Sequence, residues 1–368
     1  MELEQLQKER LEQALTFLSM EDLDSLIVFS TDSIQSRGNV RYLTNYSTHY
    51  GTSLAILHKG GAHTLLVPSG SFQLGWAKDM AWTADIRAVS SYVDGIVEEM
   101  FKMGVASGRI GLAGCEDFPG CNELQLRSAL PKANFKLVSK PFKLMKAGKS
   151  NTEVEMARKS VALGDSALGE LSSIMRIGMQ ENELLAQAAY QLFSAGAEDY
   201  FVLLGSGLRT VSPIPSGRLL EKQDIVRVSI EPASPGGLWT QTIRMYSFGK
   251  PSAEVQSAFD LCSRAIAVAE EKLRPGIMGG EIADAAIEVL KEAETGQVGP
   301  LGHGMGLDLT EPPFLRASDE TVIQLGMVIT IHPSLIWREA SIWIGDTYLV
   351  TEDKPVRLSG LPNQLTIL

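Results

Sequence analysis

Short apolar segments alternate with helical patterns through roughly the first 140 residues of the chain, and this alternation limits the folds open to it. LIVFS (26–30) has the composition of a buried strand, and LAILHKGGAHTLLVP (54–68) reads as two strands joined by a Gly-Gly turn. Residues 1–18 and VDGIVEEMFKMG (93–104) have apolar residues at helical spacing. Because helices can cover the faces of a sheet, the pattern predicts an α/β domain over residues 1–145.

The boundary of this domain falls in PFKLMKAGKSNTEVEMARKS (141–160), where a long helical pattern begins. Ser150, with Glu153 three residues later, forms a capping-box pattern at the start of that helix. The boundary contains no Gly/Ser-rich linker, so we expect two packed domains, residues 1–145 and 146–368.

The second domain contains a faint internal repeat. RIGMQENELL (176–185) resembles RPGIMGGEIA (274–283), with Glu seven residues after Arg in each copy. An Ala-rich helical pattern follows each copy, and strand-like segments follow each helix. These segments are YFVLLG (200–205), DIVRVSIE (224–231), GMVITIHP (326–333) and SIWIGDTYLV (341–350). The repeat predicts an α+β domain in which helices cover a pseudo-symmetric sheet.

Composition excludes several classes of partner. The formal net charge of -11 disfavours nucleic acid and anionic membrane surfaces, both of which attract basic proteins. The 3 cysteines form no C-x-x-C pair, so we expect a reducing compartment and no disulfide framework. The N-terminus is charged, and no apolar run reaches the ~18 residues that span a bilayer. We therefore predict a cytoplasmic protein with neither a nucleic-acid nor a membrane partner.

Several segments, in order, resemble the creatinase/prolidase/methionine aminopeptidase family. They are NVRYLTNY (39–46), the boundary segment, LGSGLRT (204–210), GHGMGLDLTEPP (302–313), GMVITIHP (326–333) and IGDTYLVTEDKP (344–355). The resemblance implies a creatinase-type N-terminal α/β domain followed by an α+β pita-bread domain. It also implies a homodimer in which the N-terminal domain of one subunit leans over the partner's cavity.

Metallopeptidases of this family hold two divalent ions with two Asp, one His and two Glu, and the resemblance places these ligands on this sequence. The second Asp matches Gln241, the His matches His303, the first Glu matches His332 and the second Glu matches Gly345. The first Asp falls within Ser229–Glu231, and the sequence leaves the register of Glu231 open. A slip of one residue would turn its side chain to the opposite face of the strand.

The matched residues predict that the two-ion mechanism is absent. Two divalent ions carry about four positive charges, which bridging carboxylates must balance. Gln241 and Gly345 cannot bridge ions, and only His303 is retained outright. We therefore predict no bound cofactor and reject a dinuclear metallopeptidase.

The preferred interpretation is metal-free catalysis, like that of creatinase, at a C–N bond of a small amide, guanidino or amidino compound. Hydrolysis and elimination both stay open. Either His303 or His332 would move the proton, since imidazole titrates near neutral pH. Either Glu231 or Glu311 would orient the imidazole or hold a cationic substrate group.

Further residues are candidates for binding the substrate. Arg244 and Arg316 would hold a carboxylate, although Arg244 is interpreted equally well as a structural residue between strands. Trp239 would stack on a planar or cationic group, and Gln241 would add a polar contact. From the dimer that the resemblance implies, the loop containing His49 and Tyr50 is a candidate lid over the partner's cavity.

Two alternatives stay open at this point. His303, His332 and Glu231 would suit a mononuclear Zn(II) or Fe(II) site, because two imidazoles and a carboxylate form a known ligand set. A retired peptidase that binds a partner without catalysis would also have lost most of the metal ligands.

Overall fold

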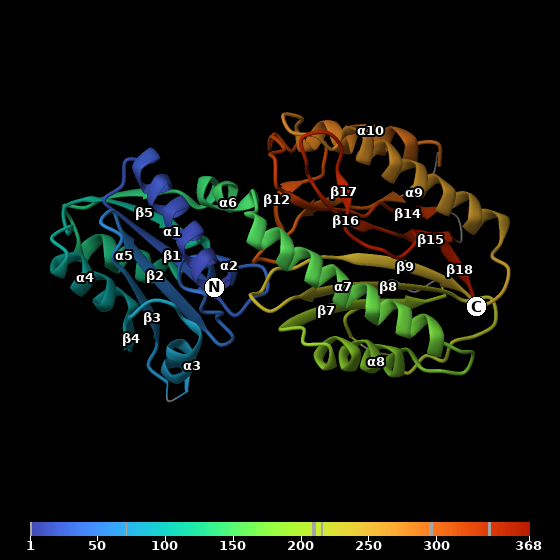
Figure 1. The fold of residues 1–368 in the computed structure, drawn as a ribbon, viewed down its shortest axis with the longest axis horizontal. Helices are drawn as coiled ribbons and strands as arrows, with labels where there is room; N and C mark the ends of the chain where they lie inside the picture. Colours follow the sequence, from blue (N-terminus) through green and yellow to red (C-terminus); the bar gives the residue numbers. More distant parts are fainter. Residues whose placement is uncertain (1, 71, 208–210, 215, 294–296, 338–339) are drawn as a thin grey trace. The chain divides into compact units, whose positions relative to one another are not determined.

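The computed structural model describes residues 2–70, 72–207, 211–214, 216–293, 297–337 and 340–368. Leu208, Arg209 and Thr210 of the LGSGLRT segment lie outside the described residues. The chain divides into two compact units, residues 1–146 and 147–368 (Figure 1).

Unit 1 is an α/β domain built on one six-stranded sheet, with strand order β4-β3-β2-β1-β5-β6. Its strands are β1 (Ser25–Thr31), β2 (Thr52–His58), β3 (His63–Pro68), β4 (Asp85–Val89), β5 (Arg109–Ala113) and β6 (Asn134–Leu137). Its helices are α1 (Glu2–Met20), α2 (Gly38–Thr44), α3 (Gln73–Met80), α4 (Tyr92–Lys102), α5 (Gly120–Ala129) and α6 (Ser139–Ala147), with a short 3-10 turn at Cys115–Asp117. The predicted alternation of strands and helices is confirmed.

The predicted Gly-Gly turn joins β2 and β3. The two strands pair antiparallel, with Leu57 opposite His63. Gly61 adopts a φ of +86°, a backbone conformation that favours glycine, and its N–H donates to the carbonyl of His58.

Unit 2 carries helices on three sheets. The helices are α7 (Asn151–Ile174), α8 (Glu181–Ser194), α9 (Ala253–Lys272) and α10 (Gly279–Leu290). The strands are β7 (Asp199–Ser206), β8 (Ile225–Ala233), β9 (Thr242–Ser247), β10 (Gln297–Val298), β11 (Gly302–Gly304), β12 (Glu311–Phe314), β13 (Val328–Ile331), β14 (Ser334–Trp337), β15 (Ala340–Trp343), β16 (Asp346–Leu349), β17 (Val356–Arg357) and β18 (Leu365–Ile367). The sheet orders are β18-β9-β8-β7, β12-β11-β13-β16-β17 and β10-β14-β15.

The repeat predicted in the second half appears as two helix pairs, each followed by strands. Figure 1 shows α7 and α8 beside β7–β9, and α9 and α10 beside the later strands. Each pair has its own apolar core: Leu168 and Leu184 pack with Val228 in the first, and Cys262 and Ile282 pack with Ile329 in the second. None of the helices in the described ranges is long and apolar enough to cross a bilayer.

The capping box at the start of α7 forms as predicted. The Ser150 hydroxyl accepts a hydrogen bond from the Glu153 N–H, at 3.3 Å. The Glu153 carboxylate in turn accepts one from the Ser150 N–H, at 3.1 Å. Both bonds satisfy N–H groups that a helix start leaves without partners, which fixes where α7 begins.

Candidate active site

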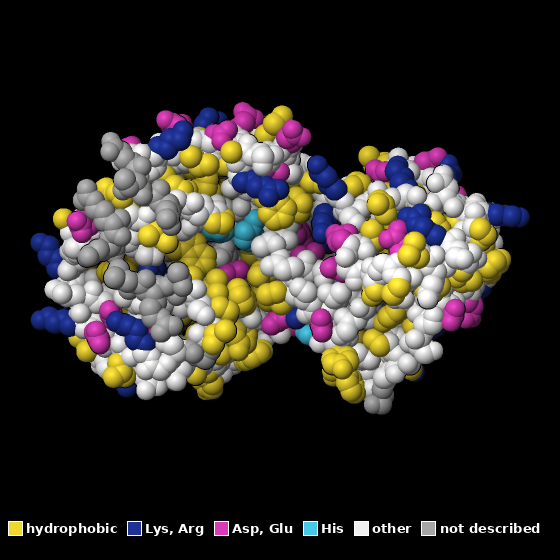
Figure 2. All heavy atoms as spheres, turned by 180° about the vertical axis from the view of Figure 1, so that it is seen from behind, with side chains coloured by type: hydrophobic (Ala, Val, Ile, Leu, Met, Phe, Trp, Pro, Cys, Tyr) yellow, Lys and Arg dark blue, Asp and Glu magenta, His cyan; other side chains and the backbone are white. Residues whose placement is uncertain are grey.

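Two histidines of unit 2 lie side by side on neighbouring strands. His303 of β11 is opposite Thr330 of β13, and the His332 N–H extends the same ladder by donating to the Leu301 carbonyl. The two side chains therefore form a diagonal pair on one face of the sheet. Their ring centroids are 5.2 Å apart and nearly perpendicular, at 69°. Figure 2 shows histidine atoms in a hollow of unit 2, bordered by hydrophobic side chains.

Hydrogen bonds assign different tautomers to the two rings. His303 Nδ1 lies 3.0 Å from the Gly304 carbonyl, which only accepts, so Nδ1 carries the proton and Nε2 has a free lone pair. Trp343 Nε1, which only donates, lies 3.4 Å from His332 Nδ1. The proton of a neutral His332 is therefore on Nε2. One ring offers an acceptor and the other a donor.

Burial keeps both imidazoles neutral. It lowers the pKa of His303 below the ordinary value, because the charged form would lose its hydration. Burial, with the neighbouring charge of His303, lowers the pKa of His332 to about 3. His332 thus stays neutral throughout the physiological pH range. The free lone pair on Nε2 makes His303 the candidate proton acceptor of the pair.

A second polar cluster lies on β8 and β9. Glu231 Oε1 accepts hydrogen bonds from Ser229 Oγ, at 3.1 Å, and from Gln241 Nε2, at 3.0 Å. Gln241 Nε2 also donates to Ser229 Oγ, at 3.0 Å. Residues two apart on a strand share a face, so Glu231 points to the same side as Ser229. The sequence had left this register open, and the structure decides it.

Burial dominates the electrostatics of this second cluster. Glu231 is 3% exposed, and burial raises its pKa to about 8 despite the hydrogen bonds from Ser229 and Gln241. The carboxyl group is therefore mostly protonated at neutral pH when nothing else is bound.

Two cross-strand rows connect the clusters. The first row is His332, Gly345, Ile243 and Ser229, and the second is His303, Thr330, Thr347 and Gln241. In the second row the Gln241 N–H donates to Thr347 Oγ1, which in turn donates to the Gln241 carbonyl. The two clusters belong to one continuous surface of the sheet system.

Gly345 makes room for His332. A Cβ atom at position 345 would lie 2.6 Å from His332 Cβ and 2.7 Å from the Ile331 carbonyl oxygen. Real Cβ atoms do not approach that closely, so any larger residue at 345 must displace the His332 backbone. The residue types at positions 332 and 345 are therefore sterically coupled in this chain.

Arg244 is a structural residue rather than the predicted substrate ligand. It is opposite Val228, so its side chain lies on the strand face away from Ser229 and Glu231. Its guanidinium donates to Asp346 Oδ1, at 2.7 Å, and to the carbonyls of Gly345 and Leu361. These bonds commit the group to joining the strands.

Two other predicted substrate ligands have partners other than the two histidines. Arg316 is exposed, and its guanidinium lies 5.6 Å from the ring centroid of Phe314. Trp239 is buried, and its backbone N–H donates to the Gly306 carbonyl. Instead, the indole that contacts a site histidine belongs to Trp343, whose ring centroid is 5.9 Å from that of His332.

Glu311 forms a buried ion pair. Its Oε2 accepts from Lys149 Nζ at 2.9 Å, and its Oε1 accepts from the Asp308 N–H at 3.2 Å. Both side chains of the pair are at most 3% exposed. The charge of Glu311 is thus balanced by lysine, which makes it a weaker candidate for orienting an imidazole than the sequence suggested.

His49 and Tyr50 belong to unit 1, in the segment between α2 and β2. Both are exposed, Tyr50 by 63%. Their exposure suits the predicted lid, which stays a prediction.

Arg227 is a site residue that the sequence analysis did not single out. A cavity of about 230 Å³ is lined by Arg227, His332, Trp343 and mainly apolar neighbours. Arg227 donates to the carbonyls of Gly207 and Ser341, and burial lowers its pKa to about 10. Alternation along β8 puts Arg227 on the face of Ser229 and Glu231, a signal already present in the sequence.

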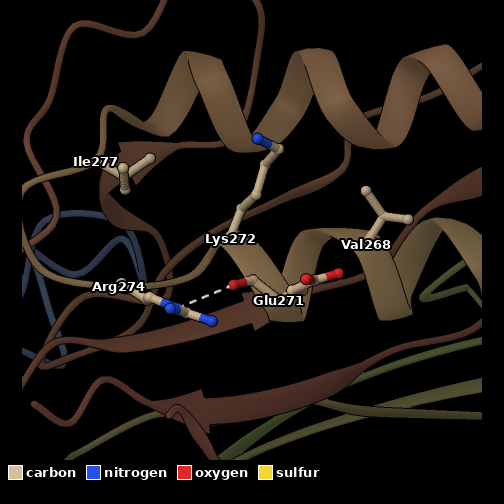
Figure 3. Close-up of a pocket in the computed structure, with 5 residues that line it drawn as sticks. All are labelled: Val268, Glu271, Lys272, Arg274 and Ile277. Carbon is tan, nitrogen blue, oxygen red and sulfur yellow. Dashed lines mark hydrogen bonds between the residues drawn. The ribbon is translucent and has the colours of Figure 1, made fainter. Parts of the chain in front are cut away.

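A separate depression of about 360 Å³ lies near the end of α9 (Figure 3). Its lining includes Glu271, Lys272 and Arg274, which are exposed charged residues. Arg274 donates to the Glu271 carbonyl, and none of the site residues described above lines this depression.

The residues present do not fit a two-ion centre. The positions that the family resemblance assigns to metal ligands hold Gln241, His303, His332 and Gly345, with Ser229–Glu231 for the first Asp, so Glu231 supplies the only carboxylate of the set. Within the described ranges, no group of three or more His, Cys, Asp or Glu side chains is placed to hold a metal. That finding also contradicts the mononuclear alternative, because Glu231 does not join the two histidines as a third ligand.

Comparison with known proteins identifies the family. Residues 10–146 match the creatinase/prolidase N-terminal domain, and residues 155–352 match metallopeptidase family M24. "Probable dipeptidase PepE" of Mycobacterium tuberculosis is 28% identical over 322 residues, which are 85% of this chain and 84% of that protein. The Xaa-Pro dipeptidase of Pyrococcus furiosus is 26% identical over 369 residues, covering 97% of this chain and 99% of that one.

Solved structures show the same fold. The X-Pro aminopeptidase of Thermotoga maritima has a TM-score of 0.87 at 21% identity, covering 97% of this chain and 99% of that one. The prolidase of Pyrococcus horikoshii has a TM-score of 0.81 at 23% identity, with the same coverage. Because the M24 match spans more than half of the 368 residues and adjoins the creatinase/prolidase N-terminal domain, the chain belongs to metallopeptidase family M24 and has its two-domain pita-bread architecture.

Proposed function

We propose that this chain hydrolyses the C–N bond of a small polar substrate, such as a dipeptide or an amide, without a two-ion metal centre. The pair of neutral imidazoles, His303 and His332, carries the proposal, since it stands where the family resemblance expects metal ligands. Relatives named dipeptidases support peptide-bond hydrolysis as the reaction class. The same names favour hydrolysis over the elimination that the sequence left open.

In this proposal His303 is the general base. Its Nε2 lone pair takes a proton from water as the water oxygen bonds to the substrate's carbonyl carbon. The imidazolium then gives that proton to the leaving nitrogen as the C–N bond breaks. The Gly304 carbonyl holds the ring by accepting from Nδ1, at 3.0 Å.

His332 would stabilise the charge that develops on the substrate oxygen. Its proton is on Nε2, because Nδ1 accepts from Trp343. His332 also lines the cavity beside Arg227. A neutral donor that does not titrate near pH 7 is well suited to an oxyanion, since it needs no change of protonation during the reaction.

Turnover of a panel of dipeptides and amides in the presence of EDTA tests the proposal, together with metal content by inductively coupled plasma mass spectrometry. We expect EDTA-resistant turnover that His303→Ala lowers by about 10²- to 10⁴-fold, the usual contribution of a general base. His63→Ala, a histidine change in unit 1, is the matched control and should leave turnover unchanged. Undiminished turnover in His303→Ala, or strict dependence on two bound ions, would overturn the proposal.

Binding of these compounds without turnover would instead identify a retired peptidase. A cytoplasmic homodimer is also part of the proposal. The net charge of -11 and the three free cysteines support a reducing compartment. Sedimentation of the purified chain would test dimerisation.

A further inference from the structure

Glu231 is a buried acid for which the described residues provide no ion pair, whereas three other buried acids of unit 2 each have a cationic partner. Glu311 pairs with Lys149, Asp346 with Arg244, and Asp224 with Arg218. Glu231 is as deeply buried, yet it receives hydrogen bonds only from Ser229 and Gln241 among the described residues. Buried carboxyl groups are normally paired or neutralised, and without a bound ligand Glu231 is neutralised by its raised pKa.

Two oxygen atoms of the cluster accept no hydrogen bond from the described residues. Both bonds to Glu231 end on Oε1, which leaves Oε2 without a hydrogen bond from the described residues. The Gln241 amide nitrogen uses its two hydrogens on Ser229 and Glu231, while its Oε1 is buried and has no partner among the described residues. Since a buried acceptor without a donor is costly, the cluster is complete only when a donor-bearing group enters it.

The charge and the donors required indicate the chemical class of that group. A primary ammonium brings three N–H donors and one positive charge, which matches two open acceptors and one carboxylate. A divalent ion would leave a positive charge uncompensated, since Ser229 and Gln241 are neutral. The high pKa of Glu231 is consistent with a missing cationic partner, because a buried carboxyl group without a counter-charge is hard to ionise.

We propose that Glu231 and Gln241 form a binding site for a primary ammonium group, which for the substrate is its free amino group. This assignment rests on the proposed function only in taking the ammonium to be part of a substrate. The site lies at the Gln241 end of the second cross-strand row, so a substrate whose amino group is held there extends along that row toward His303.

Binding of an uncleavable amine tests the site independently of catalysis. The probes are 3-methylbutylamine, its neutral counterpart 3-methylbutanol, and potassium chloride, each titrated calorimetrically at pH 8.5. An alkylamine remains protonated at this pH, as a lysine side chain does, and Glu231 is largely ionised. We expect the amine to bind at least ten-fold more tightly than the alcohol, and potassium not to compete.

Two variants assign the binding to the cluster. Glu231→Gln keeps the shape and removes the charge, and Gln241→Met removes the open amide oxygen at similar volume. Each should weaken amine binding at least ten-fold, whereas Glu320→Gln, a matched change at an exposed position, should not. If one variant fails to fold, the other still decides the assignment.

Several outcomes would overturn the inference: equal affinity for amine and alcohol, unchanged binding in Glu231→Gln, or displacement of the amine by potassium. Amine binding by a chain that hydrolyses nothing would leave the site standing and remove only the proposed function. Turnover without amine binding would leave the proposed function standing and remove the ammonium site.

Discussion

Two buried titratable groups on neighbouring strands of unit 2 have opposite surroundings. Arg244 on β9 donates to Asp346, Ser359, Gly345 and Leu361, so its charge and most of its donors are satisfied inside the protein. Glu231 on β8 has two neutral donors, no cation, and an adjacent amide oxygen without a partner within the described residues.

The difference separates a structural polar group from a binding one. A buried charge that is fully paired joins elements of the fold and has nothing left to offer a ligand. A buried polar group that is only partly satisfied costs stability, and a ligand that completes its hydrogen bonds recovers that cost. This contrast places the candidate site on the Glu231 face of the strands and excludes the Arg244 face.

The largest expected effect is the pH dependence of stability caused by Glu231. Its pKa rises from 4.5 to about 8 on folding, so the folded state binds the extra proton between these values. The free energy of unfolding should therefore fall as pH rises from 4.5 to 8, by on the order of 5 kcal/mol in total. Glu231→Gln should remove this slope and be the more stable protein at pH 8. Urea unfolding at pH 5 and pH 8 measures this change in the free energy of unfolding. An equal change in the unmodified chain and in Glu231→Gln would show that Glu231 does not cause it.

Breaking the ion pair between Arg244 and Asp346 should have the second-largest effect on stability. Arg244→Met leaves Asp346 buried without its closest cation, which should lower the free energy of unfolding by about 3–5 kcal/mol. The double variant Arg244→Met with Asp346→Leu should cost less than the sum of the single changes, because neither charge is then left alone. Additive losses in urea unfolding would show that the two groups do not act as a pair.

Gly345→Ala should have a smaller but clear effect. The added Cβ meets His332 Cβ at 2.6 Å, which predicts a loss of about 1–3 kcal/mol from overpacking and a displaced His332. The imidazole NMR signals of His303 and His332 should shift with it. Gly60→Ala is the control, since nothing lies within 4 Å of its Cβ position. Equal stability of the two variants would refute the steric coupling.

Arg316→Ala should have the smallest effect. The side chain is exposed and contacts Phe314, so its removal should change the free energy of unfolding by less than about 0.5 kcal/mol. Turnover and amine binding should also stay unchanged. A clear loss of either would return Arg316 to the candidate site.

The sequence by itself determined the fold and which types of side chain are available at the candidate site. Local patterns of period 2 and 3.6 marked the strands and helices of both units, and the Ser150 capping box located the start of α7. Side-chain identity alone shows that Gln241 and Gly345 cannot bridge metal ions. The alternation on β8 already puts Arg227, Ser229 and Glu231 on one face.

The tertiary structure decided which of these side chains meet, because those contacts join residues far apart in the chain. Arg244 finds Asp346 across 102 positions, a pairing that no local pattern encodes. The sequence singled out Trp239, but the tryptophan that contacts His332 is Trp343. Trp343 lies on β15, which β14 connects to the segment of His332. Burial, which raises the pKa of Glu231 and lowers that of His332, depends on everything packed around each group and so exists only in the folded protein.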